Sequence, residues 1–162
     1  MKTPLSSNVI FAVACVLFAQ VSLLNASDKK SVPNAPIPPQ ILAAKRIFVA
    51  NAGEDETVPE QRTFSGGPDR AYNQFYDAIK NWDRYQIVSS PSEADLIFEL
   101  EVDVNFETPI FRLTIRDPKM NAVLWRFKVR AEFGAGQGAS DKNFDQAIYR
   151  LVSHLHVLVE QP

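Results

Sequence analysis

Apolar and polar side chains alternate along three consecutive segments in the second half of this chain, residues 95–105, 110–116 and 122–133. Side chains of a strand point to opposite faces with a period of two, so this pattern predicts three strands with one buried and one wet face. Such strands are typical of an antiparallel meander, with a turn at Asp117–Asn121. The predicted buried face consists of Leu96, Phe98, Leu100, Val102, Val104, Phe111, Leu113, Ile115, Val123, Trp125, Phe127, Val129 and Phe133.

Helical spacing of apolar residues predicts two helices. The first follows Pro68, a residue type that suits the first turn of a helix, and carries a largely aromatic stripe. This stripe consists of Tyr72, Phe75, Tyr76, Ile79 and Trp82. The second helix covers residues 141–161, with Ser140 or Asp141 as its N-cap. Its apolar face consists of Phe144, Ile148, Leu151, Val152, Leu155 and Val159.

Two short β-branched and aromatic runs, residues 45–50 and 85–89, flank the first helix and favour a right-handed parallel crossover. The element order is then β-α-β-β-β-β-α. It predicts an α/β fold of the two-layer α+β kind, in which a mixed five-stranded sheet has both helices on one face. The strand order that we expect is 2-1-3-4-5, with Trp82, Phe98, Leu113 and Trp125 buried together beneath the helices.

The N-terminus has the composition of an export signal. Lys2 precedes an apolar run at residues 9–24, and the chain turns polar at Ser27. This order predicts a secretory signal peptide that is cleaved near Ala26 and Ser27. Two alternatives stay open: residues 9–24 remain as an uncleaved membrane anchor, or Cys15 carries a lipid.

The predicted organisation is therefore a signal peptide at residues 1–26, a proline-rich linker at 27–43 and one α/β domain at 44–162. Prolines between residues 31 and 40 favour extended polyproline II backbone in the linker. The expected location is the periplasm, the cell envelope or the exterior.

Charge and cysteine content narrow the function classes. The net charge is −2, and loss of residues 1–26 removes one base and no acid, which disfavours a general nucleic-acid binder. The single cysteine, Cys15, lies in the predicted signal, so the mature protein has neither disulfides nor thiolate chemistry. Such an exported protein depends on its core for stability.

No residue set indicates catalysis, a cofactor or a metal. Gly134, Gly136 and Ala139 match a loose dinucleotide-binding pattern, but they follow a meander strand rather than open a parallel β-α-β unit. His154 and His156 point about 200° apart on a helix, so they do not form a metal-binding pair. We therefore predict no catalytic, cofactor-binding or metal-binding residues.

Two groups of acids have a structural or binding interpretation. Glu99, Glu101 and Asp103 lie on the predicted wet face beside basic strands, which indicates cross-strand ion pairing. The long segment at residues 51–67 carries Glu54, Asp55 and Glu56, which we consider a candidate interaction loop.

The segments EADLIFELEV and FRLTIRDPKMNAVLWRFKV, with the strand at 45–50 and the helix at 72–82, resemble a recurrent bacterial envelope domain. It is similar to the N-terminal domain of the Tol-Pal translocation protein B, to curli-secretion lipoproteins of the CsgG type and to related uncharacterised lipoprotein domains. In these, an Ala-Asp pair opens a strand and a D-x-K/T-x-G-x-x-x-W turn joins the last two. Ala94-Asp95 and Asp117 to Trp125 stand in those places, although Asn121 replaces the glycine and no convincing lipobox is present.

The resemblance implies a binding or assembly module without an active site. We thus expect an exported, non-catalytic envelope module whose partner is an unidentified envelope protein or polymer. A small exported hydrolase that uses carboxylates is the alternative, as is a signal-anchored membrane protein with the same domain outside.

Overall fold

The computed structural model describes residues 35–54, 64–104 and 108–160, and every structural statement below concerns these residues. The elements, in chain order, are α1 (Pro39–Ala43), β1 (Arg46–Glu54), α2 (Arg70–Trp82), β2 (Gln86–Ile87), η1 (Pro91–Glu93), β3 (Leu96–Val104), β4 (Pro109–Arg116), β5 (Val123–Arg130) and α3 (Gln137–Val159).

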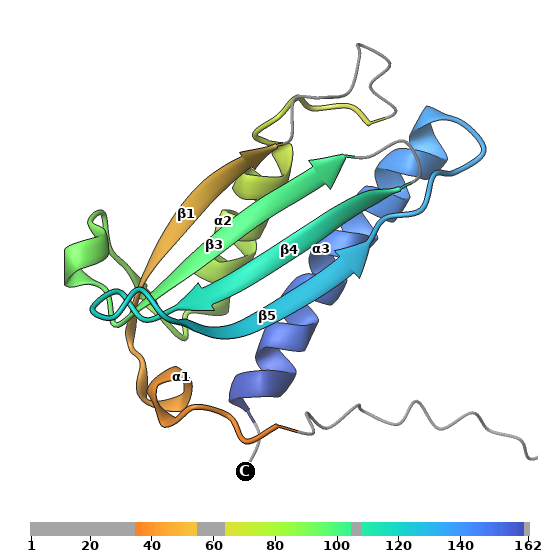
Figure 1. The fold of residues 1–162 in the computed structure, drawn as a ribbon. Coiled ribbons are helices and arrows are strands. Elements are labelled where there is room, and N and C mark those ends of the chain that lie inside the picture. Colours follow the sequence, from red (N-terminus) through yellow and green to blue (C-terminus); the bar gives the residue numbers. More distant parts are fainter. Residues whose placement is uncertain (1–34, 55–63, 105–107, 161–162) are drawn as a thin grey trace, which may run out of the picture. The chain divides into compact units, whose positions relative to one another are not determined.

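The described strands form one five-stranded sheet in the order β2-β1-β3-β4-β5. β1 runs parallel to β2 and to β3, whereas β3, β4 and β5 pair antiparallel. Figure 1 shows α2 and α3 on the same side of the sheet, and none of the described helices covers the other side. The predicted fold class, strand order and placement of both helices are therefore confirmed.

The core lies between this sheet and the two helices. Phe98 pairs with Ile115 and Leu100 with Leu113, and all four side chains are at most 1% exposed. The prediction for Phe98 and Leu113 is thus correct. Trp82 and Trp125 are only partly buried and pack against the margin of the core.

Two residues of the predicted buried face lie elsewhere. The β4–β5 ladder shifts register between Ile115 and Arg116, so Val123 pairs with Arg116 and is 41% exposed. Such a bulge places one additional residue on one strand and turns the side chains beyond it to the other face. Phe133 lies after the end of β5, where alternation no longer applies, and stacks on Phe64.

The chain enters α3 earlier than the sequence predicts, at Gln137 rather than Asp141. Ser140 and Asp141, the predicted N-caps, therefore lie within the helix. The Ser140 hydroxyl lies inside the helix and accepts a hydrogen bond from the Gly134 amide at 3.0 Å. A Cβ atom on Gly134 would collide with Ala139, so this glycine allows the close approach. The glycine-rich segment therefore makes a tight connection into a helix.

The N-terminal boundary also differs from the expectation of an extended linker up to Gln40. Pro39 begins the short helix α1, a position where a proline loses no hydrogen bond. Ile41 of α1 is fully buried and belongs to the core. At the other end of β1, the strand continues to Glu54, so Asn51 and Glu54 of the predicted long loop pair with Leu100 and Val102 of β3, with a register shift between the two pairs.

The predicted turn between β4 and β5 is confirmed. Oδ1 of Asp117 accepts hydrogen bonds from the amides of Lys119 and Met120, at 2.7 and 3.1 Å. Asn121 has a φ of 52°, in the left-handed region that glycine favours and that asparagine tolerates better than most residues. The asparagine thus provides the left-handed backbone that this turn requires.

Asp95 fastens the start of β1 to the start of β3. Its Oδ2 atom accepts hydrogen bonds from the backbone amides of Arg46 at 2.9 Å and Lys45 at 3.1 Å. Its Oδ1 atom lies 3.0 Å from Nη2 of Arg46. These contacts, the Arg46 amide first, lower the pKa of Asp95 to about 2.

Asp95→Asn should therefore destabilise the protein in a pH-dependent way. The folded-state pKa lies below the unfolded value of about 3.9, so the stabilisation is fully present above about pH 5 and disappears as the pH falls toward 2. At pH 7 we expect a loss of about 1 kcal/mol in the free energy of unfolding, discounted for the partial exposure of this side chain. Urea unfolding of both proteins between pH 7 and about 2 should show the difference narrowing.

Asp77→Asn is the control for the loss of one negative charge, because Asp77 lies on the exposed side of α2. At neutral pH its effect should be smaller than that of Asp95→Asn. A difference between Asp95→Asn and the unsubstituted protein that stays constant with pH would contradict the assigned role of Asp95.

Candidate interaction surface

The uncovered side of the sheet carries most of its ionisable side chains. We call this surface the charged face. It comprises the alternate residues of the three meander strands that point away from the helices. These residues are Glu99, Glu101 and Asp103 of β3, Arg112, Thr114 and Arg116 of β4, and Arg126, Lys128 and Arg130 of β5.

Acids of β3 pair with arginines of β4 across the strand boundary. Arg112 contacts Glu101 at 3.0 Å and Asp103 at 2.6 Å, and Arg116 contacts Glu99 at 2.6 Å. The hydrogen bond to Asp103 is the largest effect that raises the pKa of Arg112. The predicted cross-strand pairing between β3 and β4 is confirmed.

The bases of β5 are arranged differently. Arg126, Lys128 and Arg130 are exposed, and no carboxylate of the described residues lies within ion-pair distance of them. The reason is strand order, because β4 separates them from the acids of β3. Lys128 instead lies directly opposite Arg112 in the ladder, a like-charge neighbour. Positive charge is therefore in excess along β5.

A hollow of about 310 Å³ opens on the charged face. Thr114 lies among its lining residues, where a short side chain leaves space between longer ones. The other lining residues are Glu99, Glu101, Arg112, Arg116 and Arg126. Both glutamates accept hydrogen bonds from Arg112 and Arg116, so Arg126 is the lining guanidinium without a carboxylate partner among the described residues.

Of the three acids in the predicted interaction loop, the structure describes only Glu54. Glu54 is the last residue of β1, whereas Asp55 and Glu56 lie outside the described residues. The same applies to Cys15, Ala26 and Ser27 of the predicted signal. These assignments stay predictions.

The two histidines lie in different surroundings, as their spacing predicts. His156 stacks on Trp82 with 3.6 Å between ring centroids, and His154 is exposed beside Phe127. Within the described part of the chain, no group of three or more His, Cys, Asp or Glu side chains is placed to hold a metal ion. Among those same residues, no helix has the length and hydropathy that crossing a bilayer requires.

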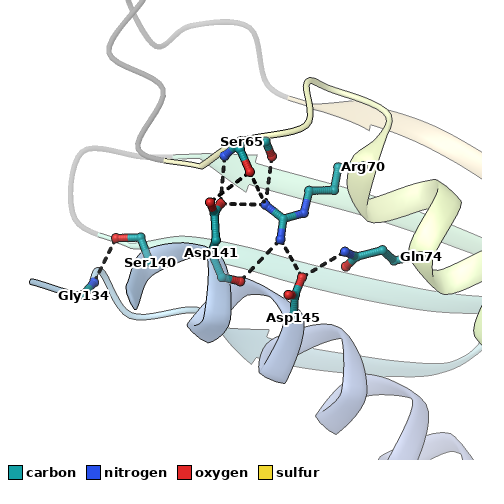
Figure 2. Close-up of polar contacts among 7 residues, drawn as sticks. All are labelled: Ser65, Arg70, Gln74, Gly134, Ser140, Asp141 and Asp145. Atoms are coloured by element: carbon teal, nitrogen blue, oxygen red, sulfur yellow. Dashed lines mark hydrogen bonds and ion pairs between the residues drawn. The ribbon is translucent and has the colours of Figure 1, made fainter. Parts of the chain in front are cut away.

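A polar network centred on Arg70 joins α2 to α3, and Figure 2 shows its members. Arg70 contacts Asp141 and Asp145, each at 2.6 Å, and donates to the Ser65 carbonyl at 2.8 Å. Its side chain is only 13% exposed, and its guanidinium lies 4.5 Å from the centre of the Phe144 ring. The backbone amide of Ser65 and the Arg70 side chain lower the pKa of Asp141. The network thereby holds the segment that leads into α2.

Sequence reasoning did not find this network because Arg70 lies 71 residues from Asp141. One signal was nevertheless present. A positive side chain at the first turn of a helix opposes the helix dipole, which favours a search for acidic partners elsewhere. Asp141 and Asp145, four residues apart, were such a pair on one side of a helix.

Comparisons with known proteins identify no family. No family model matches the chain, and no curated protein matches it. Among solved structures, the LpoB C-terminal domain from Salmonella enterica has 10% identity and a TM-score of 0.41, covering 54% of this chain and 82% of that domain. The PelC dodecamer from Paraburkholderia phytofirmans has 16% identity and a TM-score of 0.42, covering 74% and 91%.

The uncharacterised lipoprotein B from Nitrosomonas europaea has 14% identity and a TM-score of 0.32, covering 78% of this chain and 88% of that protein. At such TM-scores the three similarities carry no argument about function. The resemblance to the Tol-Pal and CsgG-type domains stays a prediction.

The ion pairs of the charged face should have a small, salt-dependent effect on stability. Glu101→Lys replaces an attraction to Arg112 by a repulsion, and the side chain of Glu101 is 47% exposed. We expect a loss of about 0.2–1 kcal/mol in the free energy of unfolding at low salt, which shrinks as salt screens the charges. Urea unfolding at low salt and at about 1 M salt measures both values.

Glu93→Lys is the matched control. It changes the charge by the same amount, and Glu93 is exposed on η1, outside the charged face. It should show a smaller dependence on salt. A loss of several kcal/mol for Glu101→Lys that salt does not alter would indicate a buried functional carboxylate instead.

Proposed function

We propose that this protein is an exported, non-catalytic module of the bacterial cell envelope that binds another envelope component. The charged face is the proposed binding surface. The observation that carries the proposal is the distribution of charge on this face. The acids are paired with arginines, whereas the bases of β5 have no carboxylate partner among the described residues.

Three features support a binding role for this surface. It is not covered by either long helix, as Figure 1 shows, so a partner reaches it without any rearrangement of the fold. Its unmatched bases provide attraction for a negatively charged partner. The hollow of about 310 Å³ around Thr114 provides a recess that part of a partner can enter.

The carboxylate hydrolase alternative has less support. A pair of acids at the floor of a pocket needs one carboxyl group that holds a proton and one that stays charged. In the hollow, Glu99 and Glu101 are each hydrogen-bonded to an arginine, at 2.6 and 3.0 Å. Both glutamates thus have an arginine partner, and this pairing does not distinguish a proton-holding carboxyl group from a charged one.

The first experiment tests export. The mature protein should begin at or near Ser27, because the small-to-polar transition after the apolar run suits a signal peptidase. Intact-mass measurement on protein isolated from the cell envelope checks this. A mass that retains residues 1–24, or that includes a lipid on Cys15, would support one of the anchored alternatives and reject the cleaved form.

The second experiment tests binding through the charged face. A photo-crosslinking amino acid in place of Val123, which is uncharged, 41% exposed and paired with Arg116 of the charged face, should give a discrete adduct with an envelope component in living cells. The same amino acid at Tyr149, which is 75% exposed on α3, is the control and should not give that adduct. The proposal fails if position 123 gives no adduct, or if both positions give the same one.

A further inference from the structure

The β5 strand forms one edge of the sheet, and the hydrogen-bond pattern identifies which of its residues face outward. The amide of Ala131, just beyond β5, donates to the Pro109 carbonyl at 3.0 Å, which marks these two residues as a hydrogen-bonded pair. Hydrogen-bonded and non-hydrogen-bonded pairs alternate along an antiparallel ladder. Val129 and Phe127 therefore turn their backbone groups toward β4, whereas Arg130, Lys128 and Arg126 turn theirs toward the free edge.

Side chains of helix α3 form hydrogen bonds with the outward backbone groups at only one end of this edge. Arg150 donates to the carbonyl of Arg130 at 2.8 Å, and Asn143 donates to the carbonyl of Glu132 at 3.0 Å. Among the described residues, no such donor or acceptor meets the outward backbone groups of Arg126 and Lys128. Both kinds of group, amide and carbonyl, are thus available there for a neighbouring strand.

The side chains at these outward positions select the kind of neighbour. A strand added at the edge places its side chains about 4.5–5.5 Å from those directly opposite, where opposite charges attract and like charges repel. On the charged face the side chains of β5 are Arg126, Lys128 and Arg130. A second copy of β5 would set bases against bases, which disfavours pairing of this chain with itself through this edge.

The sheet itself contains the complementary arrangement. β3 carries Glu99, Glu101 and Asp103 at alternate positions, and these acids contact the arginines of its neighbour β4. β5 is a second basic strand, and no described strand pairs with its outer side. An acidic strand on that side would also offset the repulsion between Lys128 and Arg112.

We propose that the free edge of β5 binds an extended acidic segment of another polypeptide by strand addition, with carboxylates at alternate positions opposite Arg126, Lys128 and Arg130. This inference rests on the proposed binding function and specifies its partner. Backbone hydrogen bonds from the edge provide affinity, and the basic side chains provide selectivity.

The test uses the full chain as isolated from the envelope and a short fluorescent peptide of alternating glutamate and valine. A peptide with the same composition in two blocks is the sequence control. A third peptide has N-methyl groups on the amides that would face β5. Fluorescence anisotropy should show binding of the alternating peptide. The block peptide should bind about tenfold more weakly, because its carboxylates do not all lie opposite the bases of β5. The methylated peptide should also bind about tenfold more weakly, because each lost hydrogen bond leaves a backbone group unpaired.

Substitutions on the protein locate the site. Lys128→Glu should weaken binding of the alternating peptide about tenfold, since it replaces a favourable cross-strand charge pair by a repulsive one. Lys142→Glu makes the same charge change at an exposed position of α3 and should leave binding unchanged. Thermal unfolding of both variants shows whether each is folded.

The outcomes separate this inference from the proposed function. Equal binding of all three peptides would mean attraction of any polyanion and would overturn strand addition. Self-association of the chain that Lys128→Glu abolishes would overturn the choice of partner. Absence of peptide binding together with a crosslink from position 123 in cells would reject the inference alone. Absence of both would reject the proposed function as well.

Discussion

The register between β3 and β4 sets both faces of the sheet, because a slip of one residue would exchange them. In the observed register Phe98 lies opposite Ile115 and Leu100 opposite Leu113, which buries the apolar row beneath the helices. The same register brings Glu99 to Arg116 on the other side. Burial is the larger contribution, since exposed ion pairs are individually weak, but the charges favour the same alignment.

The helices depend on that sheet and on one another. α2 and α3 cover the apolar face, and Arg70 joins them through Asp141 and Asp145. A guanidinium that is mostly removed from water needs such partners, because an unpaired buried charge is strongly destabilising. The flat guanidinium also lies against the ring of Phe144, so the network continues the core instead of interrupting it.

The core and the proposed binding surface thus lie on opposite faces of one sheet. The covered face holds the core, and the charged face stays open to a partner. α3 takes part in both arrangements, because it covers the core while Arg150 and Asn143 satisfy one end of the β5 edge. The remaining edge carries exposed bases, a common protection against pairing with other copies, and the same bases favour an acidic strand. Protection against self-pairing and choice of partner therefore have one physical cause.

The sequence by itself determined the features that depend on local order. Period-two alternation revealed the two faces of the meander, and helical spacing revealed α2 and the body of α3. The order of elements then led to the strand order, because parallel crossovers are right-handed and short connections join neighbours. The turn at Asp117 and Asn121 was also readable, since both residues favour turn geometry through their own side chains and backbone. The charge pairs between β3 and β4 followed directly from the same alternation.

Only the tertiary structure decided the features that depend on contacts between distant residues. The bulge beside Ile115 moved Val123 to the open face, and packing drew Ile41 into the core from a segment that reads as a linker. Arg70 contacts Asp141 because two helices lie side by side, and local order does not specify which residues of two helices come into contact. The free edge of β5 is likewise a property of the whole sheet. A strand is an edge only when nothing else in the fold pairs with it, and its own residues do not carry that information.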